Sequence, residues 1–299
     1  MLNDAHFSDP PLQTVHDPLL AAKGVELKVL RLDLVHPLVS GNKWFKLKHN
    51  LALALRQGHD TVLSFGGAYS NHLVALAAAA KLSGLRSIAV VRGEPVAPLN
   101  PALAFMQQQG MLLHWVSRSD YRRKHEDSFK QALHAQYGEF FAIPEGGGNR
   151  LGLSGTAEIA KYLQFCSPHK AAYVMLACGT AATMAGILTA LQGRQRVLGV
   201  SVLKGEDTLS AQVSAWLEEQ GQEAPCAWDV LGNFHCGGYA KTSVELLQVM
   251  SRFSQLSGIE LEPVYTGKMI YALYSLVEQG YFVQGSEIIA IHTGGLVAR

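Results

Sequence analysis

Cysteine is scarce in this chain, and the spacing that would give the few cysteines a shared role is missing. Four cysteines occur in 299 residues, at positions 166, 178, 226 and 236, and none forms a CxxC pair. We therefore expect free thiols in a reducing compartment. The twelve histidines form no HExxH motif and no clustered ligand spacing, so the sequence predicts no metal site.

Long apolar runs and an excess of charge of one sign are also missing. The longest apolar run, residues 73–80, is too short for a membrane-spanning helix, which needs about 20 residues. The net charge is +1 and the basic residues are scattered, which argues against nucleic acid or a membrane as a partner. The start MLNDAHFSDPPLQT has no apolar core after a basic stretch, so we expect no secretory signal and a cytoplasmic protein.

The chain does have enough apolar residues for a large core, 48% of the total, arranged in two alternating kinds of segment. Short β-branched runs predict strands at 61–65, 87–91, 112–116, 140–143, 172–177, 197–202 and 287–291. Helices are predicted at 73–82, 101–109, 121–137, 154–165, 183–191, 209–220, 242–257 and 268–279. This alternation predicts an α/β fold of mostly parallel, open twisted sheets with helices on both faces.

Loops of small residues follow four of the predicted strands. They read GGAYSNH (66–72), EGGGN (145–149), CGTAAT (178–183) and HTGG (292–295). Ligands of such folds bind beyond the carboxyl ends of the strands, so these loops predict a cleft for a polar, phosphorylated or planar ligand. CGTAAT is neither GxGxxG nor GxxxxGK[ST]. It suits an anion held by backbone N–H groups at a helix start, and equally a tight turn that packs a helix on the sheet.

A lysine with unusual surroundings lies in SGNKWFKLKHN, residues 40–50. Asn42 is a plausible N-cap, which would put Lys43 in the first helical turn. The positive end of a helix disfavours a protonated amine, and a neutral amine is what covalent catalysis by lysine requires. The alternative is a solvated basic helix face that Lys43 shares with Lys46 and Lys48.

Other polar side chains in the loops have two interpretations each. Ser70 and Asn71 follow a strand where either residue suits a helix cap, and His72 in the same turn is of a type that is usually structural. No GxSxG elbow surrounds Ser70, which argues against a hydrolase nucleophile. Tyr239 and Tyr265 lie close to glycines in GGYAK and PVYTGK, so they either pack in turns or present a hydroxyl to a substrate.

Taken in order, SGNK, GGAYSNH, PEGGGN, GTAAT, GYAK, PVYTGK and HTGG run through nearly the whole chain. This series resembles the pyridoxal-phosphate enzymes of the tryptophan-synthase-β-like fold (fold type II), and within them the 1-aminocyclopropane-1-carboxylate deaminases and D-cysteine desulfhydrases. The resemblance covers residues 10–299. It implies two domains with pyridoxal 5'-phosphate in the cleft between them: a larger domain of residues 1–49 and 155–299, and a smaller one of residues 50–154.

The resemblance also implies roles for individual residues. Lys43 would form the Schiff base with the cofactor, and Asn71 would bind the 3-oxygen of its ring. Ser70 would lie beside the substrate carboxylate, with Asn71, His72 and Thr293 nearby, and Tyr239 and Tyr265 would be the active-site tyrosines. The cofactor phosphate would be held by the loop of Gly179, Thr180, Ala181, Ala182 and Thr183.

This sequence departs from the family pattern at several positions. Phe45 replaces an arginine in Asn-Lys-x-Arg-Lys-Leu, and Leu32 replaces an aspartate in Arg-Asp-Asp-Leu. Gly148 stands for the serine of PEGGSN, and Ala181 and Ala182 stand where glycine is common. None of these changes removes the cofactor lysine, but they leave the exact substrate open.

Two threonines bear on which reaction of this family the chain catalyses. The deaminases resemble one another in Tyr-Glu-Gly-Lys and His-Leu-Gly-Gly, whereas this chain has Thr266 and Thr293 at the variable positions. A carboxylate beside the pyridine nitrogen would favour its protonation and strengthen the electron sink that opening a cyclopropane needs. By the same resemblance Thr266 would contact the cofactor at this nitrogen, where its hydroxyl can only form a hydrogen bond and leaves the nitrogen largely unprotonated. We therefore predict a lyase that eliminates the β-substituent of a small amino acid, with D-cysteine as the leading substrate.

Several alternatives stay open at this stage. They are a true 1-aminocyclopropane-1-carboxylate deaminase, elimination from D-serine-like or β-chloroalanine-like substrates, and a catalytically silent protein of the same fold that binds the cofactor or a phosphosugar. The base that takes the α-proton is either Lys43 or Tyr265. By resemblance alone we also expect a homodimer.

Overall fold

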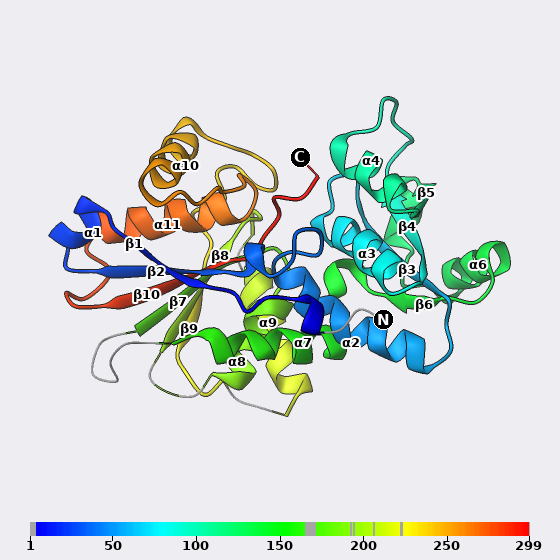
Figure 1. Cartoon of the computed structure of the whole chain (residues 1–299), viewed down its shortest axis with the longest axis horizontal. Helices are drawn as coiled ribbons and strands as arrows, with labels where there is room; N and C mark the ends of the chain where they lie inside the picture. Colours follow the sequence, from blue (N-terminus) through cyan, green and yellow to red (C-terminus); the bar gives the residue numbers. More distant parts are fainter. Residues whose placement is uncertain are drawn as a thin grey trace.

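Two sheets form the core of the molecule, and helices flank each of them (Figure 1). The computed structural model describes residues 4–164, 172–191, 193, 195–205, 207–221 and 224–298. Within these residues the larger sheet has six strands in the order β1-β2-β10-β7-β8-β9, and the smaller has four in the order β5-β4-β3-β6. Neighbouring strands run parallel except for β1 and β2. The predicted α/β class with mostly parallel sheets is therefore confirmed.

The larger sheet is buried on both faces, as parallel sheets are. It contains β1 (Leu12–Val15), β2 (Glu26–Arg31), β7 (Ala172–Cys178), β8 (Arg196–Ser201), β9 (Trp228–Leu231) and β10 (Glu287–His292). Side chains alternate along β10: Ile288 packs toward α1 (Pro18–Ala22), α10 (Val244–Ser257) and α11 (Thr266–Glu278). Ile289 packs on the opposite face, toward α8 (Ala182–Ala190) and α9 (Asp207–Glu219).

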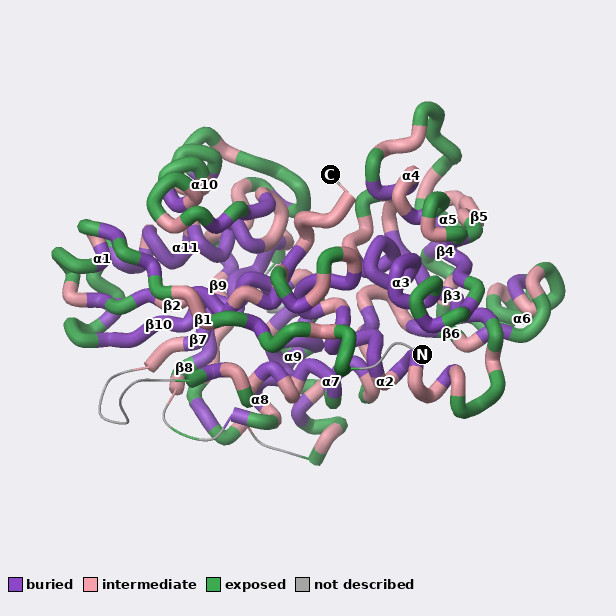
Figure 2. Tube along the Cα trace, in the orientation of Figure 1, coloured by how far each residue is buried: buried purple, intermediate pink, exposed green. Residues whose placement is uncertain are grey.

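The smaller sheet follows the same plan. It contains β3 (Thr61–Gly67), β4 (Arg86–Arg92), β5 (Leu112–Val116) and β6 (Phe141–Ile143). One face packs on α2 (Asn42–Arg56), α3 (Asn71–Leu82) and α4 (Pro101–Gln108), and the other on α5 (Arg118–Arg122) and α6 (Asp127–Tyr137). Figure 2 shows α3 largely buried and α6 largely exposed. The limits of the two predicted domains stay a prediction.

The sequence missed three strands and helix α1, predicted the start of α2 but not its extent, and misjudged two further helices. β1, β2 and β9 were not predicted, and β1 and β9 are edge strands with little burial, so their apolar alternation is weak. The helix expected over 121–137 is two helices, α5 and α6, separated by a turn that lets Tyr121 and Leu133 bury in one cluster. The helix expected over 154–165 begins earlier, as α7 (Arg150–Ala157), and continues as a 3-10 helix, Glu158–Tyr162.

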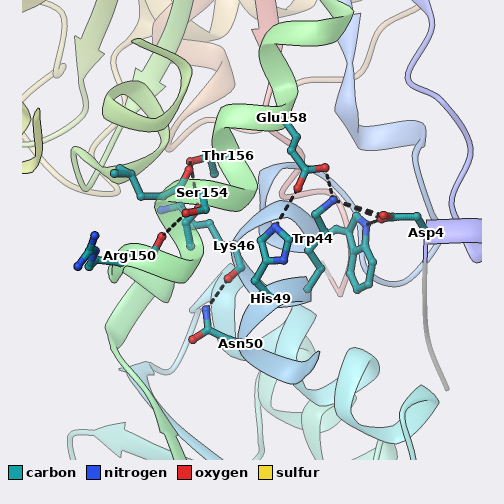
Figure 3. Close-up of polar contacts among 12 residues, drawn as sticks. Asp4, Trp44, Lys46, His49, Asn50, Arg150, Ser154, Thr156 and Glu158 are labelled. Atoms are coloured by element: carbon teal, nitrogen blue, oxygen red, sulfur yellow. Dashed lines mark hydrogen bonds and ion pairs between the residues drawn. The ribbon is translucent and has the colours of Figure 1, made fainter. Parts of the chain in front are cut away.

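Helix α2 links the two halves and is held by polar contacts to its neighbours (Figure 3). Nε2 of His49 and Oε1 of Glu158 are 2.8 Å apart, and Lys48 forms an ion pair with the same carboxylate. Nε1 of Trp44 donates to Asp4 at 3.2 Å. Phe45, one of the departures from the family pattern, is buried among the apolar residues that pack on the α8 and α9 face of the larger sheet. These contacts fix the start of α2, where Lys43 lies.

Two expectations from composition concern cysteines and membranes. Cys178, Cys226 and Cys236 are free thiols, and Cys166 lies outside the described residues. Among the helices that the structure describes, none is both long enough and apolar enough to cross a membrane.

Candidate active site

A cavity of about 960 Å³ lies between the two sheets, at the carboxyl ends of their strands. Each of the four predicted loops contributes to its lining: Gly67–His72 from the first, Glu145 and Gly146 from the second, Gly179, Thr180 and Thr183 from the third, and Thr293–Gly295 from the fourth. The predicted cleft is therefore confirmed. Lys43 at the start of α2 also lines it.

The start of α2 differs from the prediction at its cap. Gly41, with a φ of 73°, is the N-cap, and Asn42 is the first helical residue. The Asn42 side chain donates instead to Oγ1 of Thr183, at 2.9 Å, and so joins α2 to the start of α8. The prediction that Asn42 caps the helix was wrong, because its side-chain amide binds Thr183 of α8 and not a backbone N–H of its own helix.

Gly41 has a steric as well as a conformational reason to be glycine. A Cβ at this position would lie 2.0 Å from the backbone oxygen of Thr293. We expect Gly41→Ala to lower the free energy of unfolding by about 3 kcal/mol or more, from left-handed strain plus this clash. The matched control is Gly58→Ala, where φ is 78° but nothing lies within 4 Å. It should cost about 1 kcal/mol in denaturant unfolding, and equal losses in the two variants would contradict the close packing of Gly41.

Burial is what makes the Lys43 amine easy to deprotonate. It lowers the pKa of Lys43 to about 8, while the negative charge of Glu262 acts in the opposite direction. The sequence argument expected the helix terminus to do this, and the larger cause is desolvation. The direction is as predicted: a substantial part of this amine is neutral near physiological pH.

Lys46 is a candidate site residue that sequence reasoning placed on a solvated face. It is 1% exposed, lines the cavity, and donates to Oγ1 of Thr180 at 3.3 Å. Burial, followed by the nearby charge of Lys43, holds the pKa of Lys46 well below its ordinary value. No described carboxylate pairs with it. Its position three residues after Lys43, on the same helix face, was the signal available in the sequence.

The loop between β7 and α8 lies beside Lys46 and suits a phosphate. Gly179, Thr180 and Thr183 line the cavity at the N-terminus of α8, where backbone N–H groups and the helix dipole attract an anion. Ala181 and Ala182 are fully buried and are not among the lining residues, so any contact they make with a phosphate would come from the backbone. A buried lysine that no described carboxylate pairs with, two hydroxyls and a helix start together fit the phosphate of pyridoxal phosphate.

The loop after β3 brings three predicted residues to the opposite wall. Ser70 caps α3, since its Oγ accepts from the N–H of Leu73 at 3.3 Å, and it also lines the cavity. Asn71 lies against the 292–295 loop: a Cβ at Gly295 would be 2.8 Å from its side-chain nitrogen. His72 is 3% exposed and its Nε2 lies 2.9 Å from Oγ of Ser64.

The His72 ring is neutral and keeps one nitrogen without a partner. Burial and two neighbouring lysines hold the pKa of His72 well below its ordinary value. Its Nδ1 has no hydrogen-bond partner among the described residues. This is consistent with the predicted place of His72 near a ligand, and that role stays a prediction.

The two predicted tyrosines, Tyr239 and Tyr265, lie side by side in the cavity lining. The centroids of their rings are 6.2 Å apart, and the rings are nearly perpendicular. Burial, and then the neighbouring Tyr239, raise the pKa of Tyr265 well above its ordinary value. The hydroxyl of Tyr265 therefore keeps its proton at neutral pH and is a hydrogen-bond donor.

The two threonines that bear on the reaction have different surroundings. Thr293 lines the cavity, whereas Thr266 is fully buried and is not a lining residue. Oγ1 of Thr266 accepts from the N–H of Glu262 at 2.9 Å. The Glu262 carboxylate in turn accepts from the N–H groups of Val264 and Tyr265, at 2.9 and 2.6 Å, and closes the turn before α11. Of the two, Thr293 is therefore the one that lines the cavity, and the contact of Thr266 with the cofactor stays a prediction.

Comparisons with known proteins bear on the cofactor and on the fold. Residues 11–294 match the family model described as pyridoxal-phosphate dependent enzyme. A putative 1-aminocyclopropane-1-carboxylate deaminase of Pyrococcus horikoshii is 28% identical, over 91% of this chain and 85% of the relative. A D-cysteine desulfhydrase of Klebsiella pneumoniae is 30% identical, over 92% and 88%. The crystal structure of an ACC deaminase homologue superimposes with a TM-score of 0.80 at 27% identity, over 97% of this chain and 90% of that one.

Proposed function

This chain belongs to the family of pyridoxal-phosphate dependent enzymes, and on that basis we propose that it is a lyase that eliminates the β-substituent of a small amino acid. D-cysteine is the leading substrate, and its products are pyruvate, sulfide and ammonia. The relatives include proteins named for this reaction and for deamination of 1-aminocyclopropane-1-carboxylate. The observation that carries the proposal is Thr293 in the cavity wall, where the deaminases resemble one another in having leucine.

The described residues suit removal of an α-proton. The bound cofactor supplies an electron sink for the carbanion that results. Lys43 presents an amine whose pKa burial holds at about 8, so it serves as the base. Tyr265 keeps its proton and serves as a donor to the substrate, which leaves Lys43 as the preferred base of the two candidates. As the α-proton leaves, the Cβ–S bond breaks, thiolate departs with the electron pair, and the remaining fragment hydrolyses to pyruvate and ammonia.

Three substrates assayed side by side test the proposal. The protein loaded with pyridoxal phosphate is given D-cysteine, L-cysteine or 1-aminocyclopropane-1-carboxylate, and release of 2-oxo acid and sulfide is measured. We expect kcat/KM for D-cysteine to exceed that for the other two substrates by about a hundredfold. In the proposed reaction D-cysteine alone presents both its α-proton to the base and its thiolate leaving group in the orientation that elimination needs.

The variants Thr293→Val and Thr293→Ser sharpen this test. Loss of the hydroxyl should lower kcat/KM for D-cysteine about tenfold, and serine should restore it. 2-Oxobutyrate from the cyclopropane at a comparable rate would instead assign the deaminase reaction. Cofactor binding without turnover of any of the three would assign the catalytically silent alternative.

Three finer points belong to the same proposal. They are the homodimer, the cytoplasmic location and the division into domains at residues 1–49, 50–154 and 155–299. Sedimentation of the loaded protein tests the first, and limited proteolysis at the two boundaries tests the last.

A further inference from the structure

Basic side chains gather where the cavity opens on the side of the smaller sheet. Arg92 ends β4, Arg118 and Arg122 lie on α5, and Lys124 follows that helix. All four line the cavity, and among the described residues of this lining Glu145 is the one acidic side chain. Arg92 and Arg118 also line an adjoining cavity of about 620 Å³, with Glu94. The entrance is therefore cationic in a protein whose overall net charge is +1.

Most of this charge has no counter-charge within the described part of the chain. Lys124 pairs with Glu145, at 3.2 Å between Nζ and Oε2. Arg92, Arg118 and Arg122 form no ion pair with a described carboxylate. Arg92 reaches the loop after β3, because its Nη2 lies 3.7 Å from where a Cβ of Gly67 would be. The charge thus extends to the loop that carries Ser70 and Asn71.

Tyr121 lies in the middle of these cations with an unused hydroxyl. The guanidinium of Arg92 and the amine of Lys124 lie 5.4 and 4.6 Å from the centre of its ring. The side chain is 2% exposed and lines the cavity, and its hydroxyl forms no hydrogen bond of good geometry with a described residue. A buried donor without a well-placed partner costs stability, so such groups are usually satisfied by a ligand or by water. Burial, and then the nearby carboxylate of Glu145, raise the pKa of Tyr121, so the hydroxyl is present as a donor. Glu145 is itself held by Lys124, which leaves the guanidinium groups to attract an anion.

We propose that Tyr121, Arg92, Arg118 and Arg122 form an anion subsite that binds amino acids with a second acidic group on the side chain: a carboxylate, sulfonate or phosphate. Such an amino acid is a further substrate where that group can leave, and an inhibitor where it cannot. This inference rests on the proposed function and adds a class of ligand to the same cavity. The subsite uses other residues than the cluster of Lys46, Thr180 and Thr183 that suits the cofactor phosphate. D-cysteine would fill the catalytic part of the cavity and leave the subsite empty.

Elimination from such a substrate balances in the same way as elimination from cysteine. Where the acidic group is a β-phosphate, Lys43 takes the α-proton, the electron pair of the Cα–H bond forms the Cα–Cβ double bond, and phosphate leaves with the electrons of the Cβ–O bond. Where the acidic group is a carboxylate that cannot leave, the molecule binds as an inhibitor. Binding of such inhibitors reports on the subsite without turnover.

Matched pairs of acidic and neutral amino acids test the subsite by binding. Calorimetry on the loaded enzyme compares aspartate with asparagine and glutamate with glutamine, in both enantiomers, since each pair differs in charge and hardly in shape. We expect the acid of at least one pair to bind about tenfold more tightly than its amide. The difference should shrink between 0.05 and 0.5 M salt, because the entrance arginines are exposed and screened.

Variants assign the preference to particular side chains. Arg118→Gln, Arg122→Gln and Tyr121→Phe should each reduce the acid-over-amide ratio at least about threefold while the affinity for the amide changes little. The matched control is Arg123→Gln: Arg123 is next to Arg122 but pairs with Glu126 at 3.0 Å and does not line the cavity. Its ratio should equal that of the wild type.

Equal affinity for acid and amide in every pair, or no binding of any acidic member, overturns the subsite. So does an unchanged ratio in all three variants. These results are independent of the D-cysteine assay. Acid preference without sulfide release would leave the subsite intact and remove the D-cysteine proposal, whereas sulfide release without acid preference would do the reverse.

Discussion

Lys43→Ala is expected to abolish lyase activity, with kcat/KM falling by at least about a thousandfold. The reason is that one amine has two functions: it bonds to the cofactor and it takes the α-proton. The variant should also lose the visible absorption of lysine-bound pyridoxal phosphate. It should still hold the cofactor non-covalently, because Lys46, Thr180 and Thr183 do not depend on Lys43 for their positions. Equilibrium dialysis and absorbance spectra measure these two effects separately.

A small amine offers a control for Lys43→Ala. Adding methylamine should restore part of the activity if the missing group is a base in an intact cavity. In the wild type, the rate at which the apo-protein takes up the cofactor should rise with pH through about 8, the pKa to which burial lowers Lys43, because the neutral amine is the reactive form. Full activity of the variant, or a rate that falls over this range, would contradict the role of Lys43.

Lys46→Met is expected to change cofactor affinity and apo-protein stability in opposite directions. Affinity for pyridoxal phosphate should fall about 10- to 100-fold, because a charge-assisted contact to the phosphate is lost. The apo-protein should gain about 1 kcal/mol or more in the free energy of unfolding, because a buried amine, which burial disfavours in its charged form and which no described carboxylate pairs with, is replaced by an apolar side chain of similar length. Dialysis and denaturant unfolding give the two quantities.

Pyridoxal without its phosphate is the matched ligand for Lys46→Met. Its affinity should be the same in wild type and variant, since Lys46 is assigned to the phosphate. An equal loss for both ligands would mean that the substitution disturbs the whole cavity. A less stable apo-protein would mean that Lys46 makes stabilising interactions in the wild type beyond its hydrogen bond to Thr180.

Much of the fold was predictable because its central strands are apolar on both faces. β7 is a continuous apolar run, and the interior of β10 between Glu287 and His292 is apolar throughout, so their sequences identify them without any partner. β2, in contrast, has Lys28 in its interior as well as charged residues at both ends, and β9 is half-buried along its length, so neither has a local pattern that distinguishes it from a loop. The break between α5 and α6 depends on where Tyr121 and Leu133 bury, and that is a tertiary property.

The position of the site was predictable from its glycine-rich and small-residue loops. The surroundings of individual side chains were less predictable, because they depend on burial. The loops of small residues that follow the strands predicted the cavity from the sequence alone. The sequence did not predict the contacts of three residues: Asn42, Lys46 and Thr266. Two of them bind a residue far away in the sequence, and the third binds a residue that a turn brings close. Asn42 reaches Thr183, Lys46 reaches Thr180, and Thr266 is held by the turn that Glu262 closes. No spacing rule in one sequence reports that a lysine is buried.

The most direct test of this account is to find which lysine the cofactor bonds to. The loaded protein is reduced with sodium borohydride, which fixes the lysine–cofactor bond, then digested and mapped by mass spectrometry. We predict one modified residue, Lys43, at close to one cofactor per chain. Modification of Lys46 instead, or no incorporation at saturating cofactor, would contradict the assignment of this cavity and the mechanism built on it.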